Sequence, residues 1–135
     1  MPEVQYRKNV TSCAYFNHMV GDWKTVLTAM PDFSPDECIV RLITFRSEHL
    51  LPNEKDLNIY LIWSNITNDI IGSMHGSSST VSPNITLLLS SPLANELRFR
   101  LLTPVLDGAA VVDELVGEIV IHLEFVKYKR TPQRV

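Results

Sequence analysis

The sequence predicts a mostly β protein, an antiparallel β-sandwich that contains one short helix. Two runs near the C-terminus alternate apolar and polar residues with period two, which directs one set of side chains into a core and the other outward. Further short runs of β-forming residues recur along the chain, separated by turn signals at intervals of roughly 8 to 15 residues. Strands do not alternate with long helices, which argues against a parallel α/β sheet.

The two C-terminal runs are the clearest strands. Within Leu97–Leu102, apolar residues alternate with Arg98 and Arg100, and Glu118–Tyr128 alternates in the same way with acidic residues and His122. Each run is therefore expected to bury one face. The remaining predicted strands are Cys38–Phe45, Leu57–Trp63, Ile85–Leu89 and Ala109–Val116, with a helical turn as the alternative for the last, and an arm or edge strand at Pro2–Val10.

The segment Ser12–Met30 is ambiguous, because its apolar residues fall close to the helical period of 3.6. Asp22 is a suitable N-cap for a short helix over Trp23–Met30, and Pro31 then ends it. We expect at least this helix. The preceding residues, Ser12–Val20, stay open between helix and strand.

Asn65–Pro83 is predicted to be the longest irregular stretch, because it is rich in glycine and serine. A long loop in a small domain is often functional or disordered until bound. Arg46–Asp56 is predicted to form a second, polar loop. The candidate interaction residues on the long loop are Ser73, Met74, His75, Ser77 and Ser78.

Size and charge exclude several classes of protein. The chain has 135 residues, which predicts one domain over residues 1–135, and its formal net charge is −3. That charge argues against a sequence-independent nucleic-acid binder and against a basic protein of the membrane surface. No run approaches the roughly 20 apolar residues of a membrane helix, and Met1–Asn9 is unlike a signal peptide. We therefore expect a protein of the cytoplasm or of a virion.

The sequence contains no recognisable catalytic or metal-binding motif. A phosphate-binding loop needs closely spaced glycines before a helix, and a zinc site needs paired Cys or His residues at short spacings; the chain has neither. Ser73 and His75 lack the Gly-x-Ser-x-Gly setting of a hydrolase nucleophile. Cys13 and Cys38 are expected to be buried free thiols. We therefore expect no enzymatic activity, cofactor or metal.

Basic residues on the two C-terminal strands form a second candidate interaction surface. Arg98 and Arg100 face away from the core on one strand, while Lys127, Lys129 and Arg130 end the other. Neighbouring strands would join these residues into a modest basic patch, and the alternative is an ordinary solvated face. The exposed aromatic residues that a platform for single-stranded nucleic acid needs are not interleaved with them.

The segment Val116–Phe125, with the sequence VGEIVIHLEF, and the Thr-Pro-Gln at 131–133 resemble the closing strand of single jelly-roll coat proteins of small icosahedral RNA viruses. In that family a glycine opens an alternating apolar strand, and Pro or Pro-Gln follows it. The resemblance implies a jelly-roll sandwich and a viral capsid protein. The chain lacks the basic N-terminal arm with which many of these proteins bind RNA, so an arm-less coat subunit or an accessory virion protein fits better.

Together these observations predict a non-enzymatic structural protein that self-associates, as a viral capsid or accessory virion subunit. The first alternative is a monomeric protein- or peptide-binding β-sandwich, of a C2-like or adaptor kind. A small hydrolase with its site in the loop around Ser73 is a further alternative. The partner is expected to be another copy of the chain or another protein.

Overall fold

The structure is a computed structural model that describes residues 3–27, 35, 37–52, 59–75, 79–92, 95–105 and 107–129. Within these residues the chain forms ten β-strands and no helix, and so none that could cross a membrane. The strands are β1 (Val4–Met19), β2 (Asp22–Val26), β3 (Cys38–Pro52), β4 (Ile59–Ser64), β5 (Asp69–His75), β6 (Ser79–Val81), β7 (Ile85–Leu88), β8 (Glu96–Val105), β9 (Gly108–Val111) and β10 (Leu115–Tyr128).

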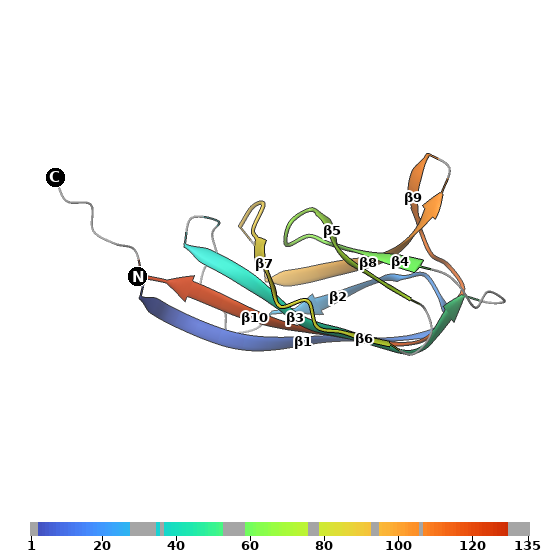
Figure 1. Cartoon of the computed structure of the whole chain (residues 1–135), viewed down its shortest axis with the longest axis horizontal. Helices are drawn as coiled ribbons and strands as arrows, with labels where there is room; N and C mark the ends of the chain where they lie inside the picture. Colours follow the sequence, from blue (N-terminus) through green and yellow to red (C-terminus); the bar gives the residue numbers. More distant parts are fainter. Residues whose placement is uncertain are drawn as a thin grey trace.

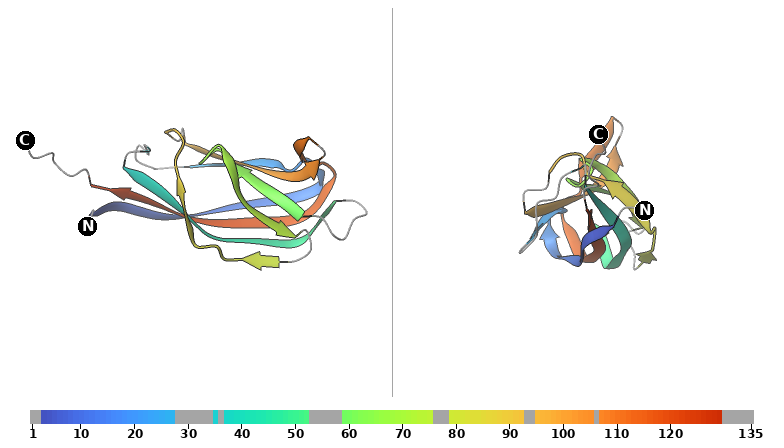
Figure 2. Two further views of the ribbon diagram at one scale, coloured as in Figure 1. Left: turned by 45° about the horizontal axis from the view of Figure 1, so that its top comes forward. Right: turned by 90° about the vertical axis from the view of Figure 1, so that its left-hand side faces the viewer.

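The strands form two antiparallel sheets that pack face to face (Figure 1). Sheet A has the order β1-β10-β3, and β6 and β7 pair with successive stretches of β3 on its far side. Sheet B has the order β2-β8-β4-β5, and β9 pairs with β8 beyond the end of β2. Figure 2 shows the two layers from two further directions. The predicted mostly β, antiparallel sandwich is confirmed.

The hydrophobic core lies between the inner faces of the two sheets. In β10, Ile119, Ile121 and Leu123 are buried and alternate with outward-facing residues, as their spacing in the sequence predicts. Phe45 of β3 and Phe99 of β8 fill the space between the sheets. Each such side chain contributes about 1.5–3 kcal/mol through its removal from water.

Hydrogen bonds close one side of the sandwich, where β1 of sheet A meets β2 of sheet B. The hydroxyl of the buried Ser12 lies 2.6 Å from Thr25 Oγ1 and accepts a hydrogen bond of 3.0 Å from Trp23 Nε1. The Trp23 ring stacks on Phe99 at 5.4 Å and meets Phe16 edge-on at 5.7 Å. This contact holds the edges of the two sheets together.

The chain passes from sheet A to sheet B at Gly21. A Cβ atom at this position would lie 2.8 Å from Leu115 Cδ1 and 3.0 Å from Leu101 Cβ, so glycine allows a closer approach than any other residue. The Gly21 N–H donates to the carbonyl of Val112 at 2.7 Å, and its own carbonyl accepts from the Leu101 N–H at 2.8 Å. These contacts place β2 beside β8.

The helix predicted over Trp23–Met30 is wrong for its described part, because Asp22–Val26 forms β2. Trp23 and Thr25 face the core, while Lys24 and Val26 face outward. The spacing of the apolar residues is compatible with both a helix and a strand, and hydrogen-bonded pairing with β8 makes this segment a strand. Most of the preceding ambiguous segment belongs to β1.

Both predicted loops are largely strand. In the first of them, residues 65–68 form a tight turn, β5 follows directly, and β6 begins at Ser79. In the turn, the Asn65 side chain accepts a hydrogen bond from the Arg98 N–H, and Asn68 has a φ of 53°. Only the face of β5 that packs on the core requires apolar side chains, and Ile71 and Met74 are buried there. The glycine and serine residues of this segment are therefore compatible with a strand. In the other predicted loop, β3 continues to its end at residue 52.

Candidate protein-interaction surface

Strand β4 is apolar on both faces. Tyr60 and Ile62 are fully buried between the sheets. The alternate residues, Ile59, Leu61 and Trp63, therefore point away from the core, and Ile59 is 49% exposed. A sheet whose outer face meets water normally carries polar residues there, so this arrangement marks the outer face of sheet B as unusual.

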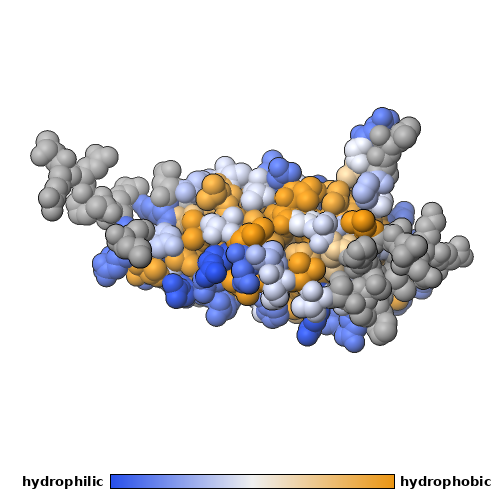
Figure 3. Space-filling view, viewed as in Figure 1, coloured by the Kyte–Doolittle hydropathy of each residue, from blue (hydrophilic) through white to orange (hydrophobic). Residues whose placement is uncertain are grey.

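Neighbouring strands extend this apolar surface. Leu61 lies opposite Leu102 of β8, which lies opposite Val111 of β9, and Trp63 lies opposite Ile70 of β5. Ile70 and Val111 are each 39% exposed. In Figure 3, which has the viewpoint of Figure 1, apolar residues gather along the middle of the body, below the projecting β8–β9 hairpin; the outer face of sheet B is seen edge-on there. We call the outward-facing apolar residues of these strands the sheet-B patch; they are Ile59, Leu61, Trp63, Ile70, Leu102 and Val111.

A charged margin borders the patch on one side. The Arg100 guanidinium lies 4.7 Å from the centre of the Trp63 ring, a cation–π contact. Asp22 of β2 forms ion pairs with Arg98 at 3.3 Å and with Arg100 at 3.7 Å. Lys24 lies directly opposite Arg98, so the margin is positive overall. Trp and Arg side chains in such a setting are the residues most enriched among binding hot spots.

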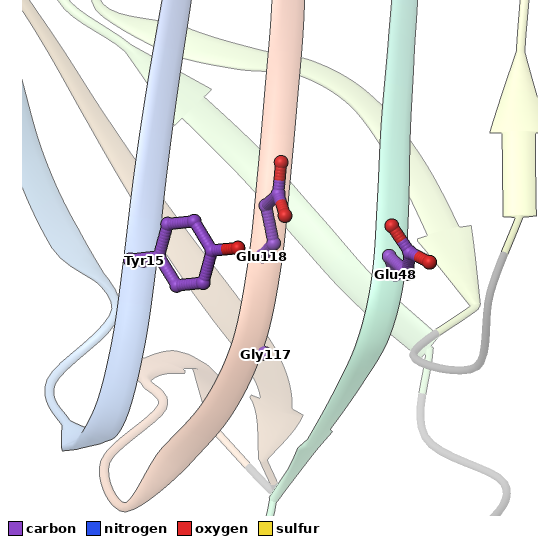
Figure 4. A pocket seen from close by; sticks show the side chains of 4 residues that line it. All are labelled: Tyr15, Glu48, Gly117 and Glu118. Carbon is purple, nitrogen blue, oxygen red and sulfur yellow. The ribbon is translucent and has the colours of Figure 1, made fainter.

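A shallow hollow of about 290 Å³ lies on the opposite side of the molecule, on the outer face of sheet A. Tyr15 of β1, Glu118 of β10 and Glu48 of β3 form one row across three strands, and Gly117 lines the floor (Figure 4). Tyr15 is 79% exposed. A hydrogen bond to the Glu118 carboxylate raises the pKa of the Tyr15 phenol, and the negative charges of Glu118 and then Glu48 raise it further.

The hollow contains two like charges at directly opposed positions, which is unfavourable without a cation nearby. Its groups can accept hydrogen bonds and offer an aromatic ring for contact. Across the described residues, no three His, Cys, Asp or Glu side chains come together as a metal site. Cys13 is exposed on the same outer face, which corrects the prediction of two buried thiols; Cys38 is buried as predicted.

The residues predicted from the supposed long loop are dispersed. Ser73 is exposed on the outer face of β5, directly opposite Leu61 at the margin of the sheet-B patch. Met74 faces inward and is buried, so it is not available at the surface. His75 ends β5, and Ser77 and Ser78 lie outside the described residues.

The predicted basic patch does not form, because its two strands lie in different sheets. Arg98 and Arg100 lie on sheet B, whereas Lys127 and Lys129 belong to the β10 end of sheet A. Lys127 pairs with Glu37 at 3.9 Å, and Lys129 pairs with Glu3 at 3.1 Å. Arg130, the fifth residue of the predicted patch, lies outside the described part of the chain.

Sequence reasoning identified Arg100 and Ser73 beside the patch but missed its apolar residues. The available signal was Leu57–Trp63, whose two faces are both largely apolar. Tyr15 carried no such signal, since its row with Glu48 and Glu118 depends on strands far apart in the sequence.

Comparison with known proteins adds little. No protein-family model matches the chain, and no curated protein matches it. Its structure is similar to that of infectious bursal disease virus, Gx strain, with a TM-score of 0.33 and 8% identity over 96% of this chain. It is also similar to a family two carbohydrate esterase from Cellvibrio japonicus, with a TM-score of 0.27 and 9% identity over 95%. The chain spans 39% and 37% of those two chains, and likenesses this low assign no function.

Proposed function

We propose that this chain is a non-enzymatic structural protein that self-associates through the sheet-B patch, as a coat or accessory subunit of a virus particle. The observation that carries the proposal is the two-sided apolar character of β4, with Ile62 in the core and Leu61 and Trp63 outside. Apolar surface left in water costs about 25 cal/mol per Å². A contiguous exposed patch of this kind is typical of a protein contact.

The strand pairings support a jelly-roll sandwich. If β6 and β7 count as one interrupted strand and β9 as an insertion, the described residues form eight strands, and the pairs are first with eighth, second with seventh, third with sixth and fourth with fifth. This is a long four-pair hairpin rolled into two sheets, the arrangement of jelly rolls, which occur in viral capsid and lectin domains and in cupins. The fold alone does not choose among these functions.

The virion assignment rests on the closing strand. Gly117 lies near the start of β10 with a φ of 127°, a conformation that other residues rarely adopt, and the alternating apolar run follows it. This agrees with the resemblance to small coat proteins found in the sequence. The net charge of −3 favours contacts with protein rather than RNA.

Substitution within the patch tests the proposal. Leu61→Glu places a carboxylate in the centre of the patch, where burial without a partner is costly. We expect light scattering across concentration to show association of the unchanged chain and a dissociation constant raised by at least about tenfold in the variant. Thr11→Glu, an exposed position of sheet A, is the matched control and should associate normally.

A failure of the unchanged chain to associate would contradict the proposal. A strict monomer at high concentration in the unchanged chain would remove self-association as the function. It would favour the alternative of a monomeric protein- or peptide-binding sandwich, and a pull-down with Leu61→Glu as the comparison would then identify whether the patch binds that partner.

A further inference from the structure

Strand β1 forms an outer edge of sheet A. It pairs with β10 on one side, and among the described residues no strand pairs with it on the other. In Figure 4 it is the outermost of the three strands that carry the row of Tyr15, Glu118 and Glu48. Strand β2 contacts it through the inward-facing side chain of Ser12, so the backbone edge of β1 stays open.

The alternation of hydrogen bonds shows which backbone groups this edge presents. The Lys129 N–H donates to the Glu3 carbonyl at 2.8 Å, on the β1 side of β10. The Tyr128 N–H donates to the Glu37 carbonyl at 2.9 Å, on the β3 side. Odd-numbered residues of β10 therefore bond to β1, and their partners from Tyr6 to Phe16 are the even-numbered residues. The odd-numbered residues of β1 direct their N–H and C=O groups to the open side; they are Arg7, Asn9, Thr11, Cys13 and Tyr15.

This edge is long and regular. β1 has 16 residues, and its register with β10 is unbroken from Tyr6 to Asn17. Natural proteins usually interrupt such an edge with bulges or charged side chains, because it is a template for another strand. Here the register shifts lie at the two ends of the strand, and the odd-numbered residues from Asn9 to Tyr15 carry no charged side chain. The edge is therefore suited to the addition of a strand.

The two ends of the edge differ in charge. At one end, Arg7 is 59% exposed and forms a long ion pair of 3.9 Å with Glu124. At the other end, Tyr15 begins the row that continues to Glu118 and Glu48. No described residue forms an ion pair with either of these two carboxylates. An antiparallel contact between two copies of β1 brings the basic end of each to the acidic end of the other.

We propose that β1 of one copy pairs antiparallel with β1 of a second copy, across a two-fold axis perpendicular to sheet A at Thr11. The two copies of sheet A then form one continuous sheet, joined by about ten backbone hydrogen bonds. This edge contact is separate from the sheet-B patch and adds a second surface to the proposed self-association. It is the weaker of the two contacts, because its outer side chains stay in water. The patch therefore dominates the association measured with Leu61→Glu and Thr11→Glu.

Charge fixes the position of the axis. With the axis at Thr11, Arg7 lies directly opposite the partner's Tyr15 and extends that row, so a cation joins the carboxylates of Glu118 and Glu48. The symmetry makes this contact twice. Thr11 meets its own counterpart, which is a favourable cross-strand pair. Moving the axis by one residue in either direction shifts Arg7 by two residues, about 7 Å, away from the row.

Charge reversal tests the edge contact by itself in the Leu61→Glu background, which removes the patch contact. We expect sedimentation to show a dimer at high concentration. Adding Arg7→Glu should raise its dissociation constant at least about tenfold, because the axis doubles each unfavourable contact. Arg41→Glu is the matched control: Arg41 also pairs with Glu124, at 3.5 Å, but lies on β3, and its loss should change the constant less than about threefold. Adding Tyr15→Lys to Arg7→Glu should restore the dimer, because the charges are exchanged across the axis.

A cross-linking experiment tests the axis directly. In a Cys13→Ser background, which removes the exposed thiol, a short bismaleimide should link Thr11→Cys to its counterpart. Residues directly opposite in a hydrogen-bonded antiparallel pair have Cα atoms about 5.5 Å apart. Arg46→Cys is exposed on the same face but lies two strands from the edge, and it should form no linked dimer. Circular dichroism and thermal melting of every variant verify that it is folded.

The outcomes separate the edge contact from the proposed function. A folded Leu61→Glu chain that stays monomeric at high concentration overturns the edge contact, whereas association through the patch stands if the unchanged chain associates. A dimer that Arg7→Glu weakens no more than its control does, or that Thr11→Cys does not link, overturns the edge contact as well. Selective loss with Arg7→Glu, recovery with Tyr15→Lys and a link through residue 11 support it.

Discussion

At the scale of single residues, Tyr15 illustrates how a neighbouring carboxylate changes an exposed group. Its phenol hydrogen-bonds to Glu118, and this bond, followed by the charges of Glu118 and Glu48, raises the pKa of the phenol above 10.0. The hydrogen bond requires the neutral phenol. Its stabilising contribution is therefore fully present below pH 10 and disappears as the pH rises through the higher pKa of the folded state.

This predicts a specific titration. In Glu118→Gln, the pKa of Tyr15 should fall toward 10.0, because the hydrogen bond to a carboxylate and the nearest negative charge are both removed. Absorbance of tyrosinate during an alkaline titration, compared with Tyr15→Phe in each background, isolates this residue from the other tyrosines. An unchanged titration of Tyr15 in Glu118→Gln would contradict the contact.

At the scale of the element, the contact between β1 of sheet A and β2 of sheet B depends on buried polar side chains in an otherwise apolar layer. Ser12 is fully buried and contacts both Thr25 and the Trp23 ring nitrogen. Ser12→Ala removes the acceptor of the Trp23 N–H and the partner of the Thr25 hydroxyl. We expect the free energy of unfolding to fall by about 1–3 kcal/mol.

Urea denaturation measures this change, with Thr11→Ala as the control on the exposed face of the same strand. That substitution loses one exposed hydrogen bond to His122 and should alter stability by less than about 0.5 kcal/mol. Equal effects of the two substitutions would show that the buried contact does not hold the sheet edges together.

At the scale of the whole molecule, the two outer faces of the sandwich differ in character. Sheet B presents the apolar patch and its hairpin, whereas sheet A presents a row of mixed charges in which Glu124 lies 3.9 Å from Arg7 and 3.5 Å from Arg41. A closed particle requires more than one contact surface on each subunit, and the outer face of sheet A, with its hollow at Tyr15, is available in addition to the sheet-B patch.

The dominance of apolar contacts predicts weak salt dependence. Raising the ionic strength from about 0.1 M to 1 M shortens the screening length from about 10 Å to 3 Å and weakens interactions between exposed charges. The dissociation constant of the proposed self-association, measured by sedimentation, should change less than about threefold. Complete dissociation at 1 M salt would instead assign the contact to the charged margin around Arg98.

The sequence alone was sufficient to predict strands and their antiparallel arrangement. From Leu97 to Leu101 in β8, and from Ile121 to Phe125 in β10, apolar residues alternate with polar ones, so local pattern and tertiary burial agree. The absence of long helical patterns then favoured a sandwich. The closing strand, with Gly117 at its start, was also visible locally.

The tertiary structure decided features that depend on distant partners. Trp23–Val26 fits a helix or a strand, and only the edge of β8 makes it a strand. Both faces of β4 are apolar, so its sequence does not show which one is buried; packing against sheet A assigns Ile62 to the core and Leu61 to the surface. Likewise, Arg98 and Lys127 are separated because strand order is set by long-range pairing. Local sequence encodes the periodicity of a strand, whereas its neighbours are determined by contacts across the whole chain.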